Sequence, residues 1–173
     1  MTASVTAPSL AELYAEVQQF YARHFHLLDA GRAQEWARTF TADGWFWPQV
    51  LPEPVRGRQA LAAGVARTHE ALAAKGEQHR HWHGMVDVCP REDGALAVRC
   101  YALIFATPAG GTPRLQLTCV CEDVLVREDG DWKVAQRRVT RDDLPAPVPA
   151  AAAPTNGAAA PTNGAAAPTA GEA

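Results

Sequence analysis

The stretch GEQHRHWHGMVDVC, residues 76–89, marks the point at which the periodicity of the sequence changes from helical to alternating. Before it, apolar residues recur at intervals of three and four, as on one face of a helix; after it, they alternate as in half-buried strands. We therefore predict strands at about 78–89, 95–107, 114–127 and 131–140, separated by turns rich in Gly, Asp and Pro.

Three helices are predicted before this stretch. Ser9 and Glu12 have the S-x-x-E spacing of a capping box, and apolar residues follow at helical spacing until Gly31. A second helical segment covers 33–40. The third, 57–76, is rich in Ala and ends at a glycine.

Helices followed by strands predict an α+β fold, namely a cone-shaped, curved antiparallel sheet with three N-terminal helices packed on its concave face. The triplet WFW, 45–47, precedes Pro48 and suits a short strand near a sheet edge. A pocket between the helices and the sheet is the expected ligand site. Because strands 95–107 and 114–127 carry apolar residues on both faces, we expect the convex face to be covered by a second subunit in a homodimer.

The two ends of the chain differ in composition from its middle. The heptad AAAPTNG occurs at 151–157 and again at 158–164, and its Pro and Gly are incompatible with a continuous helix. Such small residues cannot bury enough apolar surface to offset the entropy of ordering the chain. We therefore predict one α+β domain, 9–143, between disordered segments at 1–8 and 144–173.

Composition narrows the possible classes of function. The formal net charge is -3 and Lys and Arg are scattered, so we expect no nucleic-acid partner. No apolar run reaches the ~20 residues of a membrane span, and MTASVTAPS lacks the features of a signal peptide, which together predict a cytoplasmic protein. The cysteines lack zinc-site spacing and are expected to be small buried hydrophobic residues: Cys89, Cys100, Cys119 and Cys121.

Five motifs follow one another along the chain: LLDAG (27–31), EWARTFTADGWF (35–46), RGRQAL (56–61), RHWHGMVDV (80–88) and CEDVLVREDGDWKVAQRRVTRDD (121–143). Their order and spacing resemble the nuclear transport factor 2-like superfamily of cone-shaped α+β folds. Within it, the chain is similar to the SnoaL-like group, which includes polyketide cyclases and scytalone dehydratase-like enzymes.

The resemblance implies a general acid/base site at Asp29 and His81, which match an Asp and a His that face each other in scytalone dehydratase-like members. An imidazole titrating near pH 6.5 can remove a proton α to a carbonyl, while a carboxylate fixes its tautomer. His79 and His83 are then neighbours at the pocket rim. The second histidine and the two carbonyl-polarising tyrosines of that group fall, by spacing, on other residue types: Phe105 or Ala106, Leu28, and Phe46 or Trp47.

Aromatic side chains near the predicted pocket favour a flat aromatic or polycyclic substrate. The residues that we expect to contact the substrate are Tyr14, Tyr21, Trp45, Trp47, Trp82, Arg99, Tyr101, Phe105 and Asp123. Neighbours on a strand face opposite ways, so one of Glu122 and Asp123 and one of Arg137 and Arg138 should face the concave side. Such a pair is more often structural than ligand-binding.

The three histidines of HRHWH share a strand face, but they do not have metal-site spacing. Same-face neighbours lie ~6.6–7 Å apart and the outer two ~13 Å apart, whereas a zinc–nitrogen bond is only ~2.0–2.1 Å. We therefore predict no metal and no cofactor.

These features predict a cofactor-free cyclase, dehydratase or isomerase acting on an aromatic polyketide-type intermediate. Two alternatives remain open. The missing tyrosines favour a non-catalytic ligand-binding or accessory protein, including a role like that of a dioxygenase small subunit. Epoxide hydrolysis would require acidic and basic groups deep in the pocket, such as Asp123 with Arg99.

Overall fold

The computed structural model of the protein describes residues 7–145, so most of the two flanking segments predicted to be disordered lies outside the described residues. Three helices precede most of the sheet, as predicted. The elements in chain order are α1 (Leu10–Asp29), α2 (Ala33–Ala37), β1 (Phe40–Pro48), β2 (Val55–Arg56), α3 (Arg58–Ala74), β3 (Glu77–Pro90), β4 (Leu96–Pro108), β5 (Arg114–Glu128) and β6 (Asp131–Arg141).

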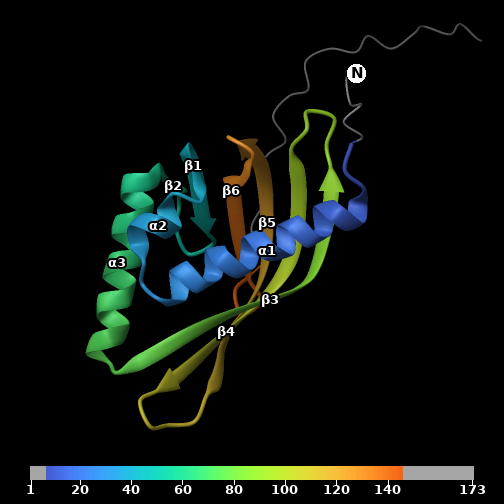
Figure 1. Ribbon diagram of the computed structural model, residues 1–173. Helices are drawn as coiled ribbons and strands as arrows, with labels where there is room; N and C mark the ends of the chain where they lie inside the picture. Colours follow the sequence, from blue (N-terminus) through green and yellow to red (C-terminus); the bar gives the residue numbers. More distant parts are fainter. Residues whose placement is uncertain (1–6, 146–173) are drawn as a thin grey trace, which may run out of the picture.

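The six strands form one curved sheet in the order β2-β1-β6-β5-β4-β3 (Figure 1). The predicted antiparallel run β3 to β6 is confirmed, with strand ends within two residues of the expected positions. The sheet is mixed where an antiparallel sheet was predicted, because β1 pairs in parallel with β6. The connection from β1 to β6 runs through β2, α3 and β3 to β5 and not through a hairpin, and this allows the parallel direction.

The second helix is shorter than predicted. It ends at Ala37, and Phe40 is already in the sheet, opposite Val134 of β6. Residues 41–44 form an irregular part of β1, where the register with β6 shifts between Phe40 and Trp45. The WFW strand is second from the edge of the sheet, with only the two-residue β2 outside it, which agrees with the predicted position near an edge.

Helix α1 begins with the predicted capping box. The Ser9 backbone N–H donates to Glu12 Oε2 at 2.7 Å, and the Glu12 backbone N–H donates to Ser9 Oγ at 3.3 Å. After α1, Gly31 turns the chain with φ of +67°, and a Cβ at this position would lie 2.4 Å from the His69 ring of α3. Only glycine combines this backbone conformation with this close approach.

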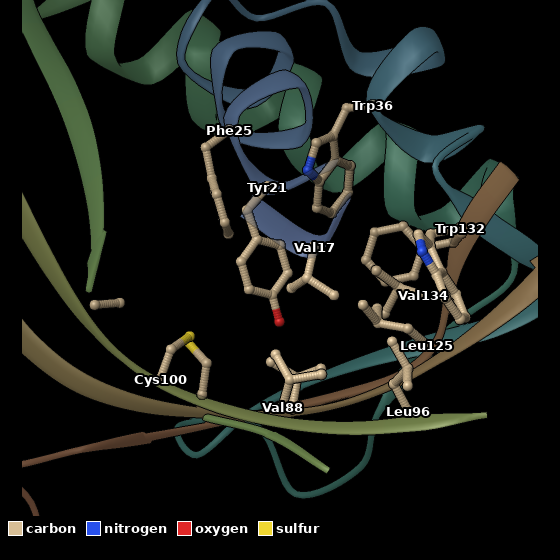
Figure 2. Close-up of a cluster of buried hydrophobic side chains, with 14 of the residues drawn as sticks. Val17, Tyr21, Phe25, Trp36, Val88, Leu96, Cys100, Leu125, Trp132 and Val134 are labelled. Carbon is tan, nitrogen blue, oxygen red and sulfur yellow. The ribbon is translucent and has the colours of Figure 1, made fainter. Parts of the chain in front are cut away.

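The helices lie on one face of the sheet, and the core forms where they meet it. Figure 2 shows Val17 and Tyr21 of α1 and Trp36 of α2 packed above Leu125 and Val134 of the curved sheet. All five side chains are buried. None of the helices in residues 7–145 is long and apolar enough to cross a membrane.

The opposite face of the sheet carries large exposed apolar side chains on β3 and β4, including Trp82, which is 65% exposed, and Tyr101, which is 53% exposed.

Three of the four cysteines are buried, as expected. Cys89 is exposed, which corrects the prediction for this residue, because it follows the buried Val88 in β3 and therefore faces the other side of the sheet.

Candidate active site

A cavity of about 800 Å³ lies between the helices and the sheet, within the usual size range of small-molecule sites. Its wall is mostly apolar and comes from the three helices and the six strands of the described residues. The aromatic residues of the wall are Phe25, Trp36 and Phe46, and the larger aliphatic residues include Leu28, Leu51, Val55, Leu61, Val65, Leu72, Ile104, Leu117 and Val139.

The aromatic wall differs from the predicted one because of strand parity. Trp82 lies between His81 and His83, both of which line the cavity, and therefore faces away from it. In β1, Phe46 lines the cavity, whereas Trp45 and Trp47 do not. The same alternation on β4, where Ala102 and Ile104 line the cavity, keeps three further predicted residues out of its wall: Arg99, Tyr101 and Phe105.

The three remaining predicted contacts also lie outside the cavity wall. Tyr14 is 42% exposed near the start of α1. Tyr21 and Asp123 are buried, and the Tyr21 hydroxyl donates to Asp123 Oδ2 at 2.6 Å. Burial and the neighbouring Asp123 carboxylate raise the pKa of Tyr21 well above its ordinary value, so this side chain keeps its proton and donates it in the hydrogen bond to Asp123.

The structure brings Asp29 and His81 together at the cavity. Asp29 is the last residue of α1, and its two oxygens accept the His81 backbone N–H at 3.1 Å and bond His81 Nδ1 at 2.5 Å. Because a carboxylate only accepts hydrogen bonds, Nδ1 carries the proton and Nε2 is left with its lone pair. This arrangement orients the imidazole as a base whose tautomer is fixed.

A second polar group forms around Arg137 of β6, a cavity-lining residue that is 3% exposed. Its Nε donates to Asp123 Oδ1 at 2.8 Å and its Nη2 donates to Asp123 Oδ2. Asp123 and Arg137 are therefore the members of the last hairpin that face the concave side. Glu122 and Arg138 pair on the other face.

His24 completes this group from α1. Its Nε2 lies 2.7 Å from Arg137 Nη1 and 3.0 Å from Trp36 Nε1, both of which are donors. Its Nδ1 therefore carries the proton and donates to Thr39 Oγ1 at 2.7 Å. Burial, and then the positive charge of Arg137, lower the pKa of His24 well below its ordinary value, so the ring is neutral.

His83 lies deeper than the rim position predicted for it. Its ring stacks on Phe25 with centroids 3.6 Å apart, and its Nδ1 is buried without a hydrogen-bond partner in the described part of the chain. Burial, followed by the charge of Arg137, lowers the pKa of His83 to about 2. His79 remains near the rim, with its Nε2 2.8 Å from Glu77 Oε1.

The one cluster with metal-ligand geometry among residues 7–145 differs from the three same-face histidines. His83, Cys100 and Cys121 each offer a ligand atom, all within 4.8 Å of one another, and Cys121 Sγ is 3.7 Å from His83 Nε2. Sulfur and imidazole donors are those that zinc prefers. The positive charge of the Arg137 guanidinium acts on both His83 and Cys121 and opposes the binding of a cation at this place.

Sequence reasoning missed several of the residues that surround Arg137. Although Tyr21 and Asp123 were included, none of His24, Phe25 and Trp36 was predicted as a site residue. Their hydrogen bonds and stacking partners lie on other elements, so no local spacing signals them. The alternation argument did limit the last hairpin to one carboxylate and one arginine on the cavity side.

Known proteins resemble this chain in sequence and in fold. The model of the SnoaL-like domain family matches residues 9–138. A structure of Aln2 from a Streptomyces species is 36% identical, with 80% of this chain and 96% of that chain covered and a TM-score of 0.71. A search of curated proteins by sequence gave no match.

Two further structures are similar over comparable lengths. ActVI-ORFA from Streptomyces coelicolor is 31% identical, with 76% of this chain and 98% of that chain covered and a TM-score of 0.72. A protein from Catenulispora acidiphila, solved in complex with S-DNPA, is 38% identical, with 76% and 95% covered and a TM-score of 0.68.

Proposed function

The chain belongs to the SnoaL-like domain family, and we propose that it is a cofactor-free general acid/base enzyme, a cyclase, dehydratase or isomerase of aromatic polyketide-type intermediates. The observation that carries this proposal is the Asp29–His81 pair at the wall of an 800 Å³ apolar cavity. Proton transfer to and from carbon requires an oriented base within reach of the substrate, and an apolar space beside it can hold an apolar substrate.

The proposed chemistry begins with His81 Nε2, which takes a proton from a carbon next to a substrate carbonyl. The C–H electron pair becomes a C=C bond, and the carbonyl π pair moves to oxygen, which gives an enolate. Asp29 stabilises the imidazolium through the Nδ1 bond. In dehydration, the carbonyl re-forms as the C–O bond at the β carbon breaks, and His81 gives the proton to the departing hydroxyl, which leaves as water. In isomerisation, His81 gives the proton to another carbon of the enolate system as the carbonyl re-forms. In cyclisation, the enolate carbon attacks a second carbonyl carbon of the substrate, and His81 gives the proton to the resulting alkoxide.

The shape of the cavity supports an aromatic or polycyclic substrate. Phe25, Trp36 and Phe46 supply aromatic surface, and most of the remaining wall is aliphatic. The related Catenulispora acidiphila protein was solved with a small molecule, S-DNPA. A small molecule is therefore our candidate ligand for the present cavity as well.

Exchange of the C2 protons of 1-tetralone, a bicyclic aromatic ketone, tests the proposal in D₂O by NMR. We expect His81→Ala to lower the protein-catalysed exchange rate by about 10²–10⁴-fold. His26→Ala is the matched control, because His26 is an exposed histidine of the same helix as Asp29. Equal exchange by the wild type and His81→Ala would refute the assignment.

We also propose that a second copy of the chain covers the exposed face of the sheet. Trp82, Met85, Tyr101 and Leu115 are each more than half exposed on β3, β4 and β5. Clustered apolar side chains of this size are typical of protein interfaces. A two-fold pairing of this face would make the homodimer that the sequence predicts.

A further inference from the structure

Arg137 has hydrogen-bonding capacity that the proposed proton transfer does not use. A guanidinium carries five N–H groups. Three of them have partners, two on Asp123 and one on His24 Nε2. The second hydrogen of each terminal nitrogen has no partner within residues 7–145, although the side chain is almost fully buried and lines the cavity.

The surrounding residues hold this guanidinium in one position. Asp123 binds it through a two-point fork, and Tyr21 in turn binds Asp123. The Arg137 Cζ lies 5.5 Å from the Tyr21 ring centre and 5.0 Å from the Phe25 ring centre. A buried charge held in this way needs no reorganisation to donate to a ligand.

The distance between Arg137 and His81 determines which part of a ligand Arg137 can reach when the reacting carbon lies at His81. Phe25 is 5.0 Å from Arg137 Cζ and 6.1 Å from the His81 ring centre, so these two groups are no more than about 11 Å apart. His83 lies close to the same phenyl ring, with its Nδ1 unpartnered. This upper limit also includes the contact at each end of the ligand, so it suits a ligand of about two fused rings.

We propose that Arg137, with His83 beside it, forms a subsite for a carbonyl or phenolic oxygen at the end of the substrate remote from the reacting carbon. This inference rests on the proposed function, because His81 defines which end reacts. The spare N–H groups of Arg137 donate to the remote oxygen. The subsite selects polycyclic substrates that carry such an oxygen and orients the acidic carbon toward His81 Nε2.

Binding of two matched ketones tests the subsite. 6-Hydroxy-1-tetralone has a phenolic oxygen opposite its ketone, and 1-tetralone lacks it. We expect the wild type to bind the hydroxylated compound about 10-fold or more tightly, the scale of one hydrogen bond to a charged group. Titration calorimetry measures both affinities.

The variant Tyr21→Phe/Asp123→Leu/Arg137→Met replaces Arg137, its carboxylate partner and the phenol bound to that carboxylate by apolar side chains, a change that buried ion pairs often tolerate. It should bind the two ketones equally. Arg138→Met is the matched control: this neighbouring arginine lies over Trp47 at 5.4 Å on the other face of the sheet and should leave the preference intact.

The outcomes separate this inference from the proposed function. His81→Ala should lose proton exchange but keep the preference for 6-hydroxy-1-tetralone. Equal affinities of the wild type for the two ketones, or binding of neither, would overturn the subsite even if the triple variant failed to fold. A preference retained in a folded triple variant, as judged by circular dichroism, would overturn it as well.

Discussion

The buried imidazole of His83 predicts a loss of stability in acid. Its pKa is about 2 in the folded protein and near 6.5 in an unfolded chain. Below pH 6.5 the unfolded chain therefore binds a proton that the folded protein does not, and the free energy of unfolding falls as the pH falls. Between pH 7.5 and pH 5.0 this one group accounts for ~2 kcal/mol, and any folded pKa below ~4 gives nearly the same value.

Urea unfolding of the wild type and His83→Phe at both pH values measures this contribution, with tryptophan fluorescence as the signal. Phenylalanine preserves the stacking on Phe25 but cannot titrate. His24, which is also held neutral by burial, is present in both proteins, so its contribution cancels. We expect the loss of stability on acidification to be ~2 kcal/mol smaller in His83→Phe. An equal loss in both proteins would refute the reasoning.

Three further predictions concern the ion pair, the base and the dimer. Asp123→Ala leaves Arg137 buried without its counter-charge and should lower the free energy of unfolding by ~3–5 kcal/mol in urea titrations. Asp29→Asn should slow 1-tetralone exchange about 10²-fold or more, with His81 still in place, because the tautomer is no longer fixed. Tyr101→Glu places a charge on the exposed face, and should convert a dimer to a monomer in sedimentation velocity; an unchanged sedimentation coefficient would argue against that interface.

The antiparallel part of the fold could be predicted because its signals are local. Alternation fixes each strand, and Gly- and Asp-containing turns fix where it ends, so β3 to β6 matched the expected ranges closely. The parallel pairing of β1 with β6 joins residues about 90 positions apart, for example Phe40 and Val134. Nothing within 33–44 specifies that partner, and an amphipathic stretch there suits a helix as well as a strand.

The candidate site was predictable to the extent that it depends on one strand and one helix end. The resemblance supplied Asp29 and His81, and the structure places them in contact. Neighbouring residues of a strand face opposite sides of the sheet, so Trp82 and His81 cannot both line the cavity. The predicted site nevertheless included both residues. In WFW, alternation separates Phe46 from Trp45 and Trp47 but cannot tell which face is covered by helices.

Helix α1 contacts both polar groups of the cavity and fixes their positions relative to each other. Tyr21, Phe25 and Asp29 are spaced by four and thus lie on one helix face, ~6 Å apart along the axis. Tyr21 binds Asp123, Phe25 stacks on His83, and Asp29 binds His81.

Same-face residues of β3 repeat at ~6.6–7 Å, close to the spacing of one face of α1, so consecutive helix positions meet consecutive strand positions. One rigid helix therefore sets the distance between the base and the guanidinium. This common support is the physical reason to treat the two groups as parts of a single ligand site.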